Sequence, residues 1–162
     1  MKHCSKGFTL LEVLIVVALI GVVVSLAIGS MGGLLANSRA KSNARDLMSN
    51  LNQAKTASIK NKKDCLVVLT YTAGANKGGA VACFDTNGDD SCVDADDQMI
   101  FNFELDGRSS VKLENVDFAD NKFEFNSRGI SNLASPSKIK FSNDSGYEIS
   151  IEVSPVGRIK IN

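Results

Sequence analysis

The stretch KGFTLLEVLIVVALIGVVVSLAIG, residues 6–29, decides how this chain is organised. From Phe8 to Ile28 it is apolar or uncharged except for one residue, Glu12. At about 1.5 Å of rise per residue, a helix of this length would cross the roughly 30 Å hydrocarbon core of a bilayer. A carboxylate in that core costs about 2.5–3.5 kcal/mol, so a plain membrane anchor would not carry Glu12.

The residues that precede the apolar run are MKHCSK, a short and positively charged flank. By the positive-inside rule, this flank places the N-terminus in the cytoplasm. An ordinary cleaved signal peptide is the alternative interpretation, with Ser25-Leu26-Ala27 as its small-x-small cleavage site. The apolar run is longer than the usual core of a signal peptide, and Glu12 lies near its start. Both features favour a retained helix.

The composition sets the broad class of the protein. The chain has 162 residues, which predicts one domain, or one domain with an appendage. Its 18 basic and 18 acidic residues balance, so the overall charge gives no argument for binding nucleic acid or an anionic surface. After the first 29 residues, the remainder is a small, polar domain with few aromatic residues and no tryptophan.

The segment 29–63 continues the helix in an amphipathic form. Its apolar residues recur at helical spacing: Leu34, Ala40, Ala44, Leu47, Met48, Leu51, Ala54 and Ala57. Lysines at 60–63 suit the end of a helix, where the helix dipole is negative. Gly29, Gly32 and Gly33 each cost about 1 kcal/mol relative to alanine in a helix, so they predict a soft joint and leave a kink at Gly29 open.

The segment 64–162 changes to the two-residue period of β-strands. Strands are predicted at 65–71, 80–84, 99–105, 111–118, 122–126, 138–141, 147–153 and 157–161. Clusters of glycine, asparagine, aspartate and serine separate them. The predicted fold is therefore α+β, with a long N-terminal helix packed on a mostly antiparallel, β-rich C-terminal domain.

The N-terminal stretch resembles the class III signal of prepilins: a basic leader that ends in glycine, then Phe, Thr, Leu, Leu, Glu and an apolar run. The resemblance implies that a membrane prepilin peptidase cuts after Gly7 and that Phe8, the new N-terminus, is methylated. It makes residues 1–7 the leader and 8–28 the transmembrane and assembly half of the helix. Glu12 becomes the fifth mature residue, which that family uses for filament assembly.

A physical role for Glu12 follows from this resemblance. The nearest cation in a packed filament core would be the α-amino group of Phe8 on a neighbouring subunit. Left unpaired, either buried charge would be strongly destabilising, so the pair would fix the register between subunits. The family often has proline where this chain has Gly29.

The rest of the chain resembles the GspH/FimT group of minor pilins and pseudopilins. The matching pieces are CFDTNGDDSCVDADDQMI at 83–100, FEFNSRG at 123–129 and VSPVGRIKI at 153–161. The resemblance implies a subunit of a type IV pilus or of a type II secretion pseudopilus, held in the inner membrane by one span. Its β domain would lie in the periplasm or on the cell surface, and its partners would be the prepilin peptidase/methylase and other pilin subunits. A monomeric, signal-anchored binding domain is the rival class, and it predicts no cleavage after Gly7.

The sequence gives no support for catalysis. Cleavage after Gly7 removes His3, the single histidine of the chain. The motifs G-x-S-x-G and H-E-x-x-H, the P-loop and G-x-G-x-x-G are all absent from the sequence. A cysteine nucleophile would lack a histidine base, so we expect a structural subunit and not an enzyme.

Cleavage would leave three cysteines, Cys65, Cys83 and Cys92, in an oxidising compartment. An odd number predicts one disulfide and one free thiol. Cys83 and Cys92 bracket an acidic turn, and a bridge that closes it would contribute about 2–3 kcal/mol. This pairing is favoured slightly over Cys65–Cys83, which would link two neighbouring strands.

The acidic turn offers hard oxygen ligands at alternating positions: Asp85, Asn87, Asp89, and Asp94 or Asp96. These are the ligands that calcium prefers. A complete EF-hand loop would require glycine at its sixth position, and this chain has Asp90 there. A solvated turn built on Asn87-Gly88 is the alternative to a calcium site, and no other cofactor is predicted.

Four basic residues near the C-terminus raise the possibility of DNA binding. Lys138 and Lys140 alternate with apolar residues on one predicted strand, and Arg158 and Lys160 do so on another. If the two strands are neighbours, the four charges form a stripe. Some FimT-type pilins bind DNA through G-R-x-R-x-R, which G-R-I-K-I-N at 157–162 matches in part. Nearby Glu148 and Glu152 weaken the field, and a solvated strand face has the same pattern.

Overall fold

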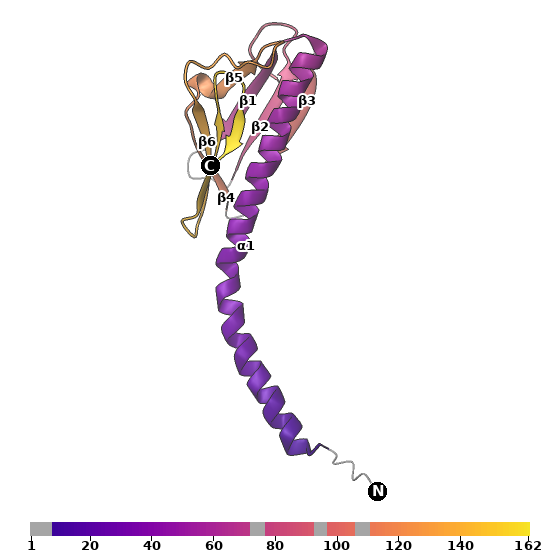
Figure 1. Cartoon of the computed structure of the whole chain (residues 1–162), viewed down its shortest axis with the longest axis vertical. Coiled ribbons are helices and arrows are strands. Elements are labelled where there is room, and N and C mark those ends of the chain that lie inside the picture. Colours follow the sequence, from indigo (N-terminus) through magenta and orange to yellow (C-terminus); the bar gives the residue numbers. More distant parts are fainter. Residues whose placement is uncertain (1–7, 72–76, 93–96, 106–110) are drawn as a thin grey trace. The chain divides into compact units, whose positions relative to one another are not determined.

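The computed structural model describes residues 8–71, 77–92, 97–105 and 111–162 (Figure 1). The chain divides into two compact units, Met1–Leu35 and Ala36–Asn162. Helix α1, Leu10–Asn61, contributes residues to both units. It ends two residues before the predicted boundary at 63, since Lys62 adopts a positive φ of 54° that a right-handed helix does not allow.

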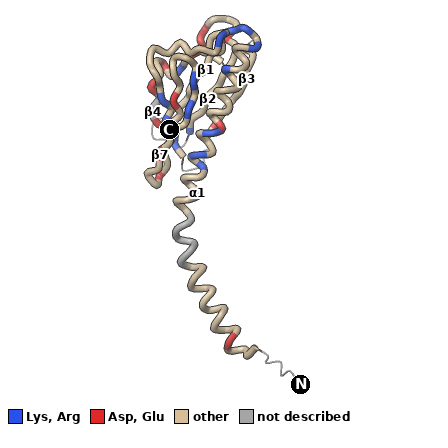
Figure 2. Tube along the Cα trace, in the orientation of Figure 1, with Lys and Arg blue, Asp and Glu red and all other residues tan. Residues whose placement is uncertain are grey.

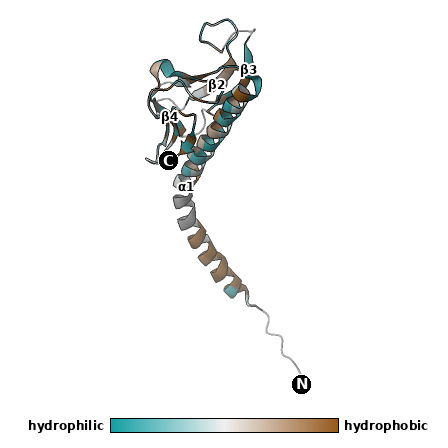
Figure 3. Cartoon of the chain, turned by 45° about the horizontal axis from the view of Figure 1, so that its top comes forward, coloured by the Kyte–Doolittle hydropathy of each residue, from teal (hydrophilic) through white to brown (hydrophobic). Residues whose placement is uncertain are grey.

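The first unit contains the start of α1. Thr9 precedes the helix and its side-chain oxygen accepts a hydrogen bond from the backbone N–H of Glu12 at 3.2 Å. The described apolar side chains of this segment are exposed, and Figure 3 shows the hydrophobic character of the segment. Across the described residues, no helix combines the length and the apolar character that spanning a membrane requires.

The second unit contains two four-stranded antiparallel sheets. The β1 sheet has the order β3-β2-β1-β5, and the β6 sheet has the order β4-β6-β7-β8. Their strands are β1 (Cys65–Tyr71), β2 (Gly78–Phe84), β3 (Gln98–Glu104), β4 (Val111–Val116), β5 (Lys122–Phe125), β6 (Ser137–Asn143), β7 (Glu148–Val153) and β8 (Ile159–Ile161). A short 3₁₀ helix, η1 (Ala119–Asn121), precedes β5. Each predicted strand is present, and the predicted α+β class is confirmed.

The core of the second unit forms between α1 and the inner faces of both sheets. The helix contributes a stripe of small and branched residues that are fully buried: Ala40, Ala44, Leu47, Leu51 and Ala54. Phe123 and Phe125 from the β1 sheet, and Phe141 and Ile151 from the β6 sheet, fill the same cluster. Small residues on the helix allow the sheets to approach its backbone closely. Leu34, which the sequence pattern placed on this stripe, is exposed and belongs to the first unit.

Part of the outer face of the β1 sheet, around Leu66, is buried as well. Cys65 and Val67 belong to the core beneath the sheet, whereas Leu66 packs with Cys83 and Cys92 in a separate cluster. This alternation follows from the strand period of two. Leu66 therefore points to the outer face, where Cys92, from the segment that follows β2, covers it.

Candidate functional site

The start of α1 holds the residues predicted for processing and assembly. Gly7 lies outside the described residues. Phe8 is 81 % exposed and lies two residues before α1, and Glu12 lies in the first turn of the helix. Together with Val13, Val16 and Val17 they line a shallow hollow of about 280 Å³. Thr9 and Glu12 have the spacing of a capping box, which satisfies an N–H group at the helix start.

The disulfide joins Cys83 to Cys92, with their Cα atoms 5.6 Å apart. The favoured pairing is therefore confirmed, and the Cys65–Cys83 alternative is not formed. Cys65 is a free, fully buried thiol on the opposite face of β1. Burial, and then the negative charge of Glu124, raise the pKa of the Cys65 thiol to about 12, so it is not a nucleophile at neutral pH.

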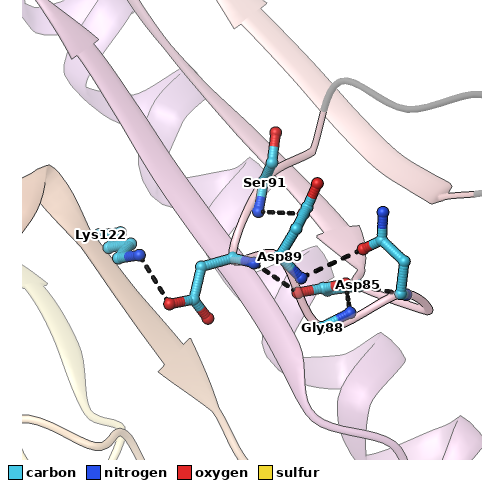
Figure 4. Close-up of polar contacts among 7 residues, drawn as sticks. Asp85, Gly88, Asp89, Ser91 and Lys122 are labelled. Carbon is cyan, nitrogen blue, oxygen red and sulfur yellow. Dashed lines mark hydrogen bonds and ion pairs between the residues drawn. The ribbon is translucent and has the colours of Figure 1, made fainter.

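The acidic turn is held by its own side chains (Figure 4). The carboxylate of Asp85 accepts hydrogen bonds from the backbone N–H groups of Asn87, Gly88 and Asp90 at 3.1, 2.7 and 2.9 Å. Asp89 accepts one from the N–H of Ser91 at 2.9 Å. These bonds favour the ionised carboxylate, so the pKa of Asp85 lies below its ordinary value, with the bond from Gly88 as the largest cause.

The calcium ligands that the sequence suggested are used differently. Oxygens of Asp85, Asn87 and Asp89 accept main-chain hydrogen bonds and so build the turn. Asp94 and Asp96 lie outside the described residues. Within the described ranges, no group of three or more histidine, cysteine, aspartate or glutamate side chains is arranged to hold a metal ion. The geometry matches the solvated turn on Asn87-Gly88, where Gly88 takes a positive φ of 76°.

The turn is tied to the edge of the β1 sheet by an ion pair. Lys122 Nζ on β5 lies 2.8 Å from Asp90 Oδ2 (Figure 4). Next to it, Glu124 is partly buried, and its pKa is raised first by that burial and then by the charges of Asp90, Asp64 and Asp85. Several carboxylates therefore gather around Glu124, beside the Lys122–Asp90 ion pair.

The basic residues near the C-terminus do not form the predicted stripe. The stripe required the two basic strands to be neighbours, and this condition is not met, because strand β7 lies between β6 and β8. Glu152 on β7 is in register with Lys138 on one side and Lys160 on the other. Two of the four basic side chains are neutralised by ion pairs: Lys160–Glu152 at 3.1 Å and Lys140–Glu148 at 2.7 Å. Accordingly the pKa of Glu152 is lowered, chiefly by the hydrogen bond from Lys160.

Two tight turns that the sequence reasoning missed meet beside the helix. In the first, Gly129 N–H donates to the Asn126 carbonyl at 2.8 Å; in the second, Gly157 N–H donates to the Ser154 carbonyl at 2.8 Å. Both glycines have positive φ, 76° and 73°. The signal in the sequence is a polar, turn-forming residue followed three positions later by glycine, which occurs at 126–129 and again at 154–157.

The two turns pack on each other and on α1. A Cβ atom at Gly157 would overlap the carbonyl oxygen of Gly129, and a Cβ at Gly129 would lie 2.7 Å from Ile59 Cδ1. Lys55 Nζ on α1 donates to the Gly157 carbonyl at 2.7 Å. The side-chain hydroxyl of Ser131 donates to the Ser154 carbonyl at 2.9 Å. These contacts fix both turns to the last helical turns of α1.

Comparisons with known proteins agree with this arrangement. Residues 2–28 match the family model for the prokaryotic N-terminal methylation motif, and residues 43–157 match that for the type II transport protein GspH. No curated protein sequence matches the chain.

Two crystal structures of the type IV minor pilin FimU of Pseudomonas aeruginosa (strain PAO1) are similar to the chain at 12 % sequence identity. Their TM-scores are 0.56 and 0.59. The matched regions cover 75 % and 77 % of this chain, and 91 % and 89 % of the two FimU chains. At this identity the likeness shows the fold, a long N-terminal helix followed by antiparallel sheets. The GspH match spans most of the chain and carries the family assignment. The chain therefore belongs to the GspH family of minor pilins and pseudopilins, which are structural subunits, and it bears their N-terminal methylation motif.

Proposed function

We propose that this chain is a pilus or pseudopilus subunit that is cleaved after Gly7, methylated on Phe8 and assembled into its filament through Glu12. The observation that carries the proposal is the start of α1, an exposed apolar surface that contains a single carboxylate. A surface of this kind is stable in water only when it is covered. The methylation motif at residues 2–28 supports the same interpretation.

The proposed route begins in the inner membrane, with residues 8–28 as a single span that is processed by a prepilin peptidase/methylase. Residues 1–7 are the leader, and residues 29–63 and 64–162 form the amphipathic helix and the outward-facing β domain. On assembly, residues 8–28 leave lipid and pack against the same segment of neighbouring subunits. The exposed side chains of this segment are mostly valine, leucine and isoleucine, which suit both environments.

The pairing step follows from the placement of Phe8 and Glu12. Phe8 carries the positive amine and lies just before the first turn of α1, and Glu12 lies in that turn. A neighbouring subunit shifted along the filament axis brings its Glu12 to the amine of Phe8. Pairing the two charges removes the cost of leaving either one buried alone.

The experiment compares Glu12 variants in the native membrane. Glu12→Ala and Glu12→Gln should still be inserted and cut after Gly7, because the peptidase reads the leader, and intact mass should show a methylated N-terminus at Phe8. Incorporation should fail, because the unpaired amine costs about 3–5 kcal/mol, or two or more decades in an assembly equilibrium. Glu12→Asp should be intermediate, since it retains the charge with a shorter side chain.

The readout is the fraction of cleaved protein found in sheared filaments or cross-linked to other subunits. Normal recovery of Glu12→Ala in that fraction would show that Glu12 does not pin assembly. A mature N-terminus at Ile28 would indicate an ordinary signal peptidase and would refute the whole proposal.

A further inference from the structure

A basic and partly apolar surface surrounds the two glycine turns, and the proposed assembly through Glu12 does not use it. We name it the terminal patch, since it lies at the C-terminal end of α1. Its apolar centre is Ile59, Ile130 and Val156, which are 45 %, 41 % and 71 % exposed. Its rim is basic and exposed: Lys60, Lys62, Lys63, Arg128 and Arg158. Figure 2 shows basic residues gathered at this end of α1.

Contacts between the turns and the helix bring these residues onto one surface. Gly129 packs against Ile59, and Gly157 packs against Gly129 and Ile130. Arg128 immediately precedes Gly129, and Val156 and Arg158 flank Gly157. All of these residues belong to the unit Ala36–Asn162.

The lysines of the rim are attached to the same turns. The backbone N–H of Ser127 donates to Asp64 Oδ1 at 3.0 Å, so the segment that follows α1 runs against the first turn. Lys62 and Lys63 lie between Ile59 and Asp64, both of which contact that turn. The basic rim and the apolar centre therefore form one continuous surface.

Folding alone explains only part of this surface. Lysines at the end of a helix offset its negative dipole, which accounts for Lys60 and its neighbours. It does not account for Arg128 and Arg158, or for three exposed aliphatic side chains beside them. Within the described residues, no salt bridge joins the five cations of the rim to a carboxylate. This contrasts with the β6 sheet, where Lys140 and Lys160 are paired.

We propose that the terminal patch binds an acidic segment of another protein that also carries an aliphatic side chain. The basic rim would pair with its carboxylates, and the aliphatic side chain would cover Ile130 and Val156. Arginines around an apolar centre are typical of protein–protein interfaces. Proteins that bind single-stranded nucleic acid usually stack the bases on aromatic side chains, and the patch has none among its residues. The proposal is independent of Glu12 and of cleavage after Gly7.

The test uses the full chain in nonionic detergent micelles and a fluorescein-labelled peptide in which glutamate and leucine alternate. Fluorescence anisotropy, measured against empty micelles, should show binding that weakens as salt is raised. A peptide with glutamine in place of each glutamate, and one with serine in place of each leucine, should both bind more weakly.

The decisive variants reverse charge in two places. The double variant Arg128→Glu, Arg158→Glu should weaken peptide binding about tenfold or more, as expected when two central contacts are lost. The matched control is Arg39→Glu, Arg45→Glu, which makes the same charge change at exposed helix positions outside the patch and should change binding less than about twofold. Val156→Ser should weaken binding without any change in charge.

Equal losses in the two double variants would overturn the proposal, because the effect would then be one of net charge. Tighter binding of a DNA duplex than of the peptide, lost in the same Arg128 and Arg158 variant, would also overturn it in favour of a nucleic-acid surface. Both double variants should retain the Cys83–Cys92 bridge and the wild-type circular dichroism spectrum, which shows that folding is intact.

Discussion

At the scale of single residues, Gly157 and Gly129 show how the absence of a side chain determines packing. Both have positive φ, which glycine adopts without cost. The two turns approach so closely that a Cβ on Gly157 would overlap backbone, which cannot move aside as a flexible side chain can. Gly88 has the same φ of 76° but no atom within 4 Å of an added Cβ. A comparison of Gly157 with Gly88 therefore separates the cost of the backbone conformation from the cost of a clash with neighbouring atoms.

Gly157→Ala should lower the free energy of unfolding by about 3 kcal/mol or more, since it adds a backbone clash to an unfavourable φ. Gly88→Ala should cost only about 1–2 kcal/mol, the cost of a left-handed conformation alone. Urea unfolding of both variants provides the comparison. Equal losses would mean that the turns separate without cost, contrary to the packing described.

Glu124 provides a prediction about pH. Its pKa in the folded protein is raised above the ordinary value of 4.5, chiefly by burial, so the native state binds a proton more tightly than the unfolded state does. The ionised carboxylate therefore destabilises the fold above its folded pKa, and the effect is absent below about pH 4.5. Glu124→Gln should raise the urea midpoint at neutral pH, and the gain should disappear on acidification.

Glu104, which is exposed at the end of β3, is the matched control. Glu104→Gln should leave the midpoint nearly unchanged across the same pH range. A Glu124→Gln variant that is less stable than the wild type at neutral pH would show that its carboxylate is satisfied by its surroundings.

At the scale of elements, the described segment 85–92 that follows β2 covers part of the outer face of the β1 sheet. Asp85 builds its turn, Cys92 packs it on Leu66, and Asp90 reaches Lys122 on β5. The connection thus starts at β2 and is fixed to both β1 and β5. The Cys83–Cys92 disulfide also constrains the unfolded chain, whereas the Asp90–Lys122 ion pair acts only in the folded state.

The double variant Cys83→Ser, Cys92→Ser should lose about 2–3 kcal/mol of stability, the amount expected for a short closed loop. Lys122→Ala removes only a solvent-exposed ion pair and should cost less than about 1 kcal/mol. Guanidinium unfolding under non-reducing conditions measures both. A larger loss for Lys122→Ala than for the cysteine variant would show that the ion pair, and not the bridge, holds the cover.

At the scale of the whole molecule, the buried hydrophobic residues among the described side chains all lie at or after Ala36. The described apolar side chains before it are exposed. This distribution suits a chain whose first part is covered by other molecules and whose second part covers itself.

A shortened chain of residues 36–162 should therefore unfold in one transition, with a free energy within about 1 kcal/mol of that of the β domain in the full protein. Denaturant unfolding followed by circular dichroism measures both. A shortened chain that is unfolded, or that has lost several kcal/mol, would show that residues before Ala36 support the core.

Much of this architecture could be predicted because strand periodicity is local. The alternation along CLVVLTY at 65–71 reproduces β1 to the residue. The order of strands within the two sheets depends on tertiary pairing, so the periodicity left open whether the strands of Lys138 and Lys160 are neighbours, and the structure shows that they are not. A local signal was available, since turns at 143–147 and 154–158 make β6, β7 and β8 consecutive hairpin strands and place β7 in the middle.

Among the candidate sites, Cys83–Cys92 was predictable because its two residues are close in sequence and flank a turn. The sequence alone could not assign the role of Asp85 as an acceptor of main-chain hydrogen bonds. Aspartate and asparagine are common both in turns and as calcium ligands, so their presence does not distinguish the two. The terminal patch could not be predicted. It joins residue 59 to residues 130 and 156, and only packing between distant turns brings them together.

The two faces of β1 have a consequence for how the protein acquires its disulfide. Cys65 points toward the helix, whereas Cys83 lies opposite Leu66 and points away from it. A bond between them would require β1 to slip by one residue along β2, since such a shift exchanges the faces of every side chain. A Cys65–Cys83 bridge in freshly oxidised protein would therefore be a covalent record of a mispaired hairpin. Its yield in peptide mapping would report the fraction of molecules in which β1 paired with β2 in a register shifted by one residue.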